Sequence, residues 1–274
     1  MDFFAARGRL PDLDELPETA AVITALGSLK RAFCVIQSAT GAEAWVDIAA
    51  KRAQDLLIYL ALARFDRRPT LSNLPIPLQR HIKALFPSYA QACKQADDLL
   101  FSVGSTGEVN AACSASPIGK KTPEALYVHI SGIDQLPPSL RVFEGCARAY
   151  IGRVEGGNLI KLSRLEPKIS YLTYPDFEED PHPALAHSLS VHLQTFRVRT
   201  RDYTGFRNPP ILHRKETFVP AEHTLRAKFA RLTAAEESKG LLDEANRIGT
   251  RNHWEQVLSE KGLSLRGHRL IVRR

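Results

Sequence analysis

The sequence predicts an α+β protein in which an N-terminal helical bundle (residues 1–115) precedes a mixed or antiparallel β-sheet domain with flanking helices (residues 116–274). Two patterns lead to this prediction. In the first part, apolar residues recur at steps of three and four, as on the buried face of an amphipathic helix. In the second part, short apolar or alternating segments end at Gly and Pro, as strands do. Residues 104–121 separate the two patterns and contain the turn-forming Gly104 and Gly107, which is typical of a domain boundary.

Amphipathic helices with short connections account for the bundle. Their expected ranges are residues 19–39, 42–65, 76–86 and 87–103. Each of them places apolar side chains along one face, so the four helices are expected to pack together.

Strands dominate from residue 125 onward, and helices return at the C-terminus. The strands are expected at residues 125–131, 158–163, 168–174, 190–201 and 211–218, and the helices at residues 138–150, 222–232, 234–242 and 252–261. Residues 190–201 alternate apolar with basic side chains, which indicates a half-exposed strand with a basic outer face. Parallel βαβ repeats and a glycine fingerprint after a strand are missing from the sequence. We therefore expect no S-adenosylmethionine, nicotinamide or flavin site within the chain.

The positive charge of the chain is concentrated in its second part. The formal net charge is +7; residues 1–120 contain 13 Lys and Arg against 12 Asp and Glu, and residues 121–274 contain 24 against 18. This asymmetry points to a polyanionic partner, most simply nucleic acid, and the alternative is a basic surface that only aids solubility. No apolar run is long enough to span a bilayer and no signal peptide is visible, so we expect a cytoplasmic protein without a membrane partner.

Two stretches, residues 167–183 and 208–218, concentrate polar side chains where strands end at prolines, which is how a site is usually built on a rigid sheet. The residues that could carry out catalysis are His129, Asp176, His213 and Glu216. A metal-dependent nuclease would use Asp176 and Glu216 to hold Mg²⁺, with His129 or His213 transferring a proton.

The spacing of these groups does not favour a nuclease or a metal site. The order Lys215-Glu216 is not the Glu-x-Lys of restriction-type nucleases, and a solvated acidic loop explains the carboxylates better. The histidines at positions 182, 187, 192 and 213 lack the spacing of a zinc cage, so we expect no metal site.

A nucleic-acid surface fits the residues better, because basic groups interleaved with aromatic ones can contact phosphates and stack on bases or sugars. The residues predicted to hold phosphates are Lys120, Lys121, Lys168, Arg214, Lys215, Arg266 and Arg269, and those predicted to line the site are Tyr171, Tyr174 and His213.

Ten ordered phrases along the chain carry a family resemblance. They are GSLKRAF (27–33), DLLIYLALARF (55–65), SPIGKK (116–121), ALYVHIS (125–131), RVFEGCARA (141–149), PKISYLTYPDFEEDPHPAL (167–185), RDY (201–203), NPPILHRKETF (208–218), RIGTR (247–251) and LRGHRL (265–270). In this order they resemble the C-terminal part of the DNA phosphorothioation-associated methyltransferase family, over nearly the whole chain.

The resemblance implies a place in bacterial gene neighbourhoods where sulfur replaces a non-bridging oxygen of the DNA backbone. Family members usually carry an N-terminal S-adenosylmethionine domain, and no part of this chain matches that domain. We therefore expect a separately encoded or excised C-terminal half, whose S-adenosylmethionine chemistry would come only from a partner or an absent domain.

The leading hypothesis is a DNA-binding or target-recognition module of a phosphorothioation-linked modification or phage-defence system. It would bind duplex DNA, plain or phosphorothioated, and act with a methyltransferase or another catalytic protein of the system. Two alternatives stay open: a Mg²⁺-dependent DNA nuclease of the same system, and a protein-interaction subunit.

Overall fold

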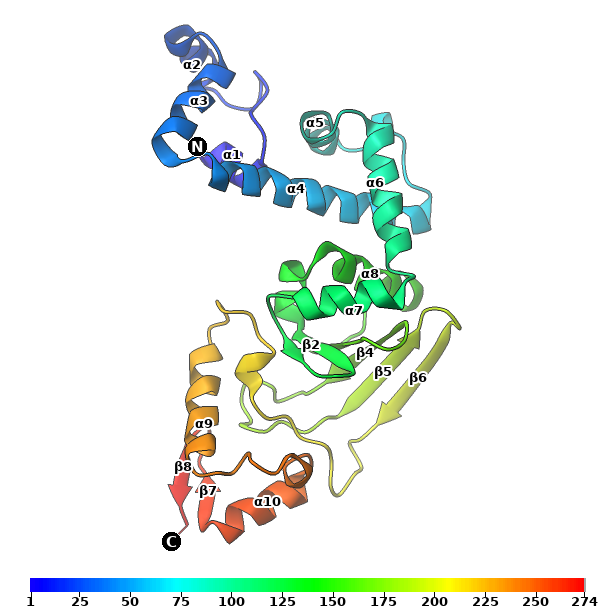
Figure 1. Ribbon diagram of the computed structural model, residues 1–274, viewed down its shortest axis with the longest axis vertical. Coiled ribbons are helices and arrows are strands. Elements are labelled where there is room, and N and C mark those ends of the chain that lie inside the picture. The colour runs from blue at the N-terminus through cyan, green and yellow to red at the C-terminus, as the bar shows by residue number, and fades with distance from the viewer. Residues whose placement is uncertain (274) are drawn as a thin grey trace. The chain divides into compact units, whose positions relative to one another are not determined.

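The computed structural model describes residues 1–273 and confirms the α+β class (Figure 1). The chain forms two compact units, which divide between Ser102 and Val103. The first unit is helical. The second contains a six-stranded antiparallel sheet with helices packed on it. The helix Thr106–Ala115 belongs to the second unit, although it lies within the stretch expected to complete the helical domain.

The first unit is built from six α-helices and two short 3₁₀ turns. Their bounds are α1 Asp2–Arg7, α2 Thr19–Leu26, α3 Leu29–Thr40, α4 Glu43–Leu62, η1 Ala63–Asp66, η2 Leu71–Asn73, α5 Ile76–Leu85 and α6 Tyr89–Ser102. The single helix expected over residues 19–39 is two helices. Gly27 ends α2, and the Ser28 hydroxyl caps α3 by accepting a hydrogen bond from the backbone N–H of Arg31 (3.1 Å). A serine cap of this kind starts a new helix because it satisfies one of the free N–H groups of the first turn.

Aromatic packing holds the start of the first unit together. The Trp45 ring lies edge-on to Phe4 and Phe33, with centroids 5.5 and 5.6 Å away, and Phe4 and Phe33 stack at 4.3 Å. Within residues 1–273 no single helix has both the length and the apolar content to cross a membrane; α2 and α3 pass that test only as a pair bent by 78°.

The sheet of the second unit is an antiparallel meander in the order β1-β2-β3-β4-β5-β6. The strands are β1 Lys120–Lys121, β2 Ala125–His129, β3 Leu159–Ser163, β4 Lys168–Thr173, β5 His187–His192 and β6 Arg197–Asp202. The central strands are buried on both faces: Leu126, Leu159, Leu162 and Ile169 have almost no exposed surface. Hydrophobic residues on both faces require a covering layer on each side, and flanking helices and loops supply it.

Helices α7 Thr106–Ala115 and α8 Pro138–Ile151 lie together against the sheet (Figure 1). Phe143 and Leu140 of α8 are fully buried. Arg164, after β3, anchors α7 by donating to the Asn110 side chain (2.7 Å) and to the Ser114 hydroxyl (2.8 Å). The remaining elements are η3 Ile130–Gln135, η4 Lys215–Thr217, α9 Arg226–Ser238, η5 Ala245–Arg247, α10 Arg251–Glu260, β7 Leu263–Leu265 and β8 Leu270–Val272.

Sequence-based element assignments are wrong in three regions after residue 190, namely residues 190–201, 211–218 and 222–242. Residues 190–201 form a hairpin of β5 and β6 rather than one strand, because the chain turns back after His192, which pairs with Arg197. Phe196 in this turn has a left-handed φ of 53°. The two helices expected between residues 222 and 242 are the single helix α9.

Residues 211–218 do not form a strand. Arg214 adopts a left-handed φ of 57°, which breaks the extended conformation, and Lys215–Thr217 follow as a 3₁₀ turn. His213 and Lys215 are nevertheless buried, whereas Arg214 and Glu216 are partly exposed.

The two polar stretches singled out in the sequence nevertheless lie side by side. Ala184 and Ile211 form an isolated antiparallel bridge, the Leu185 N–H donates to Pro210 O (2.9 Å), and the Leu212 N–H donates to Pro183 O (3.1 Å). This short pairing brings the loop after β4 against the segment before η4. A cluster containing Phe177, Leu212 and Phe229 packs beneath it.

Candidate functional site

A buried polar cluster occupies the place where these two stretches meet α9. We call it the His–Glu–Lys cluster; its members are His182, His213, Lys215, Glu236 and His268. His182 comes from the first stretch, His213 and Lys215 from the second, and Glu236 from α9. The side chains of these four are at least nine-tenths buried, with Glu236 completely so. Buried ionisable groups are uncommon and are normally paired, so each contact of the cluster needs an account.

His182, His213 and Glu236 lie in direct contact. His182 Nε2 is 2.7 Å from Glu236 Oε1, and the His182 and His213 rings are 4.2 Å apart between centroids. Trp254 of α10 packs edge-on against both rings, at 4.7 Å from each. Burial lowers the pKa of His182 to about 4 and that of His213 to about 3, and raises the pKa of Glu236 to about 8. Burial therefore favours the neutral form of all three groups at neutral pH.

Lys215 joins the loop after β4 to the C-terminal hairpin. Its ammonium group donates to the carbonyl oxygens of Phe177 (2.7 Å) and Asp180 (2.6 Å) and lies 3.0 Å from His268 Nε2. It also lies 4.1 Å from the centroid of the Phe229 ring, a cation–π distance. Burial lowers the pKa of Lys215 to about 7. All three N–H donors have acceptors, which leaves none for an external phosphate.

A basic cavity lies on the other side of His268, between α9 and the β7–β8 hairpin. Its volume is about 570 Å³, and its lining is Lys228, Arg231, Ala235, Arg266, His268, Arg269 and Leu270. Among residues 1–273 no carboxylate lines it, and no side-chain ion pair is seen for Lys228, Arg266 or Arg269. Together with Arg231, these three cations surround one concavity and create a positive potential that attracts anions.

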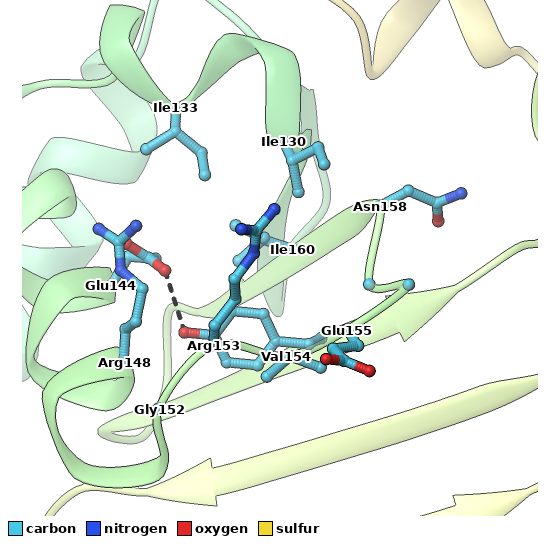
Figure 2. Close-up of a pocket in the computed structure, with 13 residues that line it drawn as sticks. Ile130, Ile133, Glu144, Arg148, Gly152, Arg153, Val154, Glu155, Asn158 and Ile160 are labelled. Carbon is cyan, nitrogen blue, oxygen red and sulfur yellow. Dashed lines mark hydrogen bonds and ion pairs between the residues drawn. The ribbon is translucent and has the colours of Figure 1, made fainter.

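The predicted DNA-contacting residues divide into two groups. Tyr171, Tyr174, His213 and Lys215 are buried, so the expectation that they contact DNA at the surface is not supported. The Tyr171 hydroxyl donates to Glu144 Oε1 (3.1 Å), and burial raises the pKa of both groups. This pair sits in the wall of a separate cavity of about 730 Å³, where Figure 2 shows Glu144 beside Arg148, across from Ile133.

The lysines and Arg214 from the predicted set are engaged within the protein. Lys121 donates to Ser114 O (2.7 Å), Lys168 pairs with Glu166 (3.0 Å), and Arg214 pairs with Glu237. Lys120 lies over the Phe218 ring (5.3 Å), and burial lowers its pKa. Arg266 and Arg269, which line the basic cavity, are the members of the set best placed to bind an anion.

The predicted catalytic residues are not gathered into one site. Asp176 is exposed, and Glu216 accepts a hydrogen bond from the Thr233 hydroxyl (2.8 Å). His129 is stacked on Phe177 (4.7 Å) with its Nδ1 2.8 Å from the Ser131 hydroxyl, and burial lowers its pKa to about 4. Within residues 1–273, the one group of three His, Cys, Asp or Glu side chains that could hold a metal ion is His182, His213 and Glu236.

Sequence reasoning missed Glu236, Lys228 and Arg231, which all come from α9. Lys228 and Arg231 are three residues apart and therefore lie on one face of that helix. This spacing could have identified a basic helix face from the sequence. Nothing in the local sequence distinguishes Glu236 from its neighbour Glu237, which is exposed. No family model, no curated protein and no solved structure matches the chain.

Proposed function

We propose that the second unit binds duplex DNA through the basic cavity between α9 and the β7–β8 hairpin. The protein then serves as a target-recognition module of a DNA phosphorothioation-linked modification or defence system in the bacterial cytoplasm. A partner protein, such as a methyltransferase that binds S-adenosylmethionine, carries the chemistry.

The basic cavity is the observation that carries this proposal. Lys228, Arg231, Arg266 and Arg269 surround it without a lining carboxylate within residues 1–273. Arginine recognises phosphate with a planar fork of donors, and lysine acts as a point charge, so the mixture suits a phosphate backbone. The phosphate contacts would position the DNA without reading its sequence.

The edge strand β6 offers a second basic surface. Arg197, Arg199 and Arg201 alternate along it and therefore share one face, and all three are exposed. No ion pair or side-chain hydrogen bond to another described residue engages them. A row of free arginines also protects an edge strand from pairing with other chains, so this surface is secondary in the argument.

The proposal can be tested by fluorescence anisotropy with a labelled duplex over a salt series. The double variant Arg266→Glu/Arg269→Glu should weaken binding about 10- to 100-fold and reduce the salt slope by about 2, one unit for each lost phosphate contact. The matched control is Lys51→Glu/Lys94→Glu, which makes the same change in net charge at exposed positions of the first unit and should retain nearly all affinity.

Equal losses in the two double variants would mean that net charge alone drives binding and would remove the cavity from the proposal. Absence of binding to any duplex at low salt would end it. A parallel titration uses the same duplex with phosphorothioate linkages and tests the link to DNA modification. If the link holds, the protein binds the two duplexes with different affinities.

A further inference from the structure

The hydrogen bonds of His182 and His213 determine which ring nitrogens carry protons. His182 Nδ1 lies 3.2 Å from Leu212 O, and His213 Nε2 lies 2.6 Å from Ile248 O. A carbonyl oxygen can only accept, so each of these nitrogens must be the N–H donor. In the neutral rings the opposite nitrogens, His182 Nε2 and His213 Nδ1, then present lone pairs.

His182, His213 and the Glu236 carboxyl group each contribute a potential ligand atom to one small region. The potential ligand atoms of the three residues all lie within 4.8 Å of one another. His213 Nδ1 and Glu236 Oε2 are buried there without a hydrogen-bond partner. A buried polar atom without a partner destabilises the fold, so two of them in one cluster require an explanation.

We propose that His182, His213 and Glu236 form a binding site for a divalent transition metal of the zinc class. Ligand atoms about 2.0–2.1 Å from a tetrahedral ion are about 3.4 Å from one another. Side-chain movements of roughly an ångström would bring the three groups from their present spacing to that geometry.

The donor set and its surroundings select this class of metal. Two imidazoles and one carboxylate suit zinc, whereas Mg²⁺ and Ca²⁺ prefer oxygen ligands. The two backbone carbonyls that orient the rings are the outer partners that metal-binding histidines normally have. The carbonyl groups of Leu212 and Ile248 thus already hold the two imidazole rings in the metal-binding tautomer before a metal binds.

Three protein ligands leave a position open for water. A cavity of about 220 Å³ reaches His182 and is also lined by Asp180, Arg251 and Trp254. Of the three proposed ligands, His182 is the one that lines this cavity. Zinc sites with three protein ligands and one water are the type that can activate that water.

Metal binding would also join three segments of the second unit. His182 lies in the loop after β4, His213 precedes η4, and Glu236 belongs to α9. A metal at their junction stabilises the folded unit by its binding free energy, since the unfolded chain does not hold the ligands together. This inference is independent of DNA binding, because its test measures metal content.

The test uses the full chain, stripped with a chelator, dialysed and then reconstituted with Zn²⁺. Zinc per chain is measured by inductively coupled plasma mass spectrometry, affinity by titration calorimetry, and stability by the melting temperature with and without Zn²⁺. The key variant is Glu236→Gln, which retains the shape of the side chain and a hydrogen bond to His182 but is a poor zinc ligand. His213→Gln is the second variant, and His253→Gln, at an exposed position of α10, is the matched control.

We expect about one Zn²⁺ per chain for the parent and for His253→Gln, with a higher melting temperature in Zn²⁺. Affinity should fall at least about 100-fold in Glu236→Gln and in His213→Gln, since each removes a direct ligand. A parent chain that retains no Zn²⁺ and gains no thermal stability would overturn the proposal. So would a Glu236→Gln variant that is folded and binds Zn²⁺ as tightly as the parent.

Discussion

Gly119 lies in the SPIGKK phrase directly before β1, so replacing it by alanine perturbs the point where β1 meets β2. Gly119 has a φ of +89°, and an added Cβ would lie 2.6 Å from Tyr127 O and 2.6 Å from a Val128 methyl group. Lys120 pairs directly with Tyr127, so neither the backbone oxygen nor Gly119 can move without breaking the β1–β2 register. This glycine therefore permits the close approach of the β1 and β2 backbones.

Two costs add in Gly119→Ala. Holding a non-glycine residue at a left-handed φ costs roughly 1–2 kcal/mol. Forcing a methyl group into a packed position costs about 1–3 kcal/mol more. We therefore expect the free energy of unfolding of the second unit to fall by about 2–5 kcal/mol.

Two control substitutions in the same unit separate these costs. Gly262 has a φ of +63° with nothing within 4 Å of an added Cβ, so Gly262→Ala should show the backbone cost alone, about 1–2 kcal/mol. Gly205 has no neighbour within 4 Å and no left-handed φ, so Gly205→Ala should change stability by less than about 0.5 kcal/mol.

The assay is urea unfolding followed by the fluorescence of Trp254. The chain has two tryptophans, one in each unit, so all variants are made in a Trp45→Phe background that leaves Trp254 as the reporter. The reasoning is refuted if Gly119→Ala is no less stable than Gly262→Ala, because the close contact with Tyr127 O would then cost nothing.

Two further predictions concern buried groups of the second unit. Tyr171→Phe removes the donor to the buried Glu144 and should lower the free energy of urea unfolding by about 1–3 kcal/mol without changing DNA affinity. The control Tyr150→Phe, at an exposed position, should lower it by less than about 0.5 kcal/mol. Equal losses in the two variants would contradict the buried Tyr171–Glu144 pair. His129, which faces His223, has a pKa lowered by burial to about 4 from 6.5, so the unfolded chain binds a proton more readily between these values. The contribution of neutral His129 to stability is full above about pH 6.5 and is lost as the pH falls from there to about 4, by roughly 1–2 kcal/mol. His129→Gln should flatten this part of the curve of stability against pH. An unchanged curve would contradict the buried neutral state of His129.

The regular elements were predictable because local periodicity reflects burial. The strands at 125–129, 159–163 and 168–173 and the helix at 138–151 were all expected close to where they lie, since each carries a clear two- or three-to-four-residue apolar pattern. Residues 190–201 misled the prediction because both strands of a hairpin alternate in the same way, and its turn contains no glycine or proline. Residues 211–218 misled it because the left-handed Arg214 is not a residue type that marks a break.

The sequence by itself singled out residues 167–183 and 208–218 as two stretches with polar side chains near prolines, and the structure showed that they pair with each other. The sequence also identified Arg266 and Arg269 as anion-binding candidates. Only the tertiary structure decided that Lys215 is buried while these arginines are exposed, and that Glu236 of α9 meets His182 and His213. The physical reason is that burial depends on which distant segments pack over a side chain. Residue type and spacing describe only its neighbours along the chain.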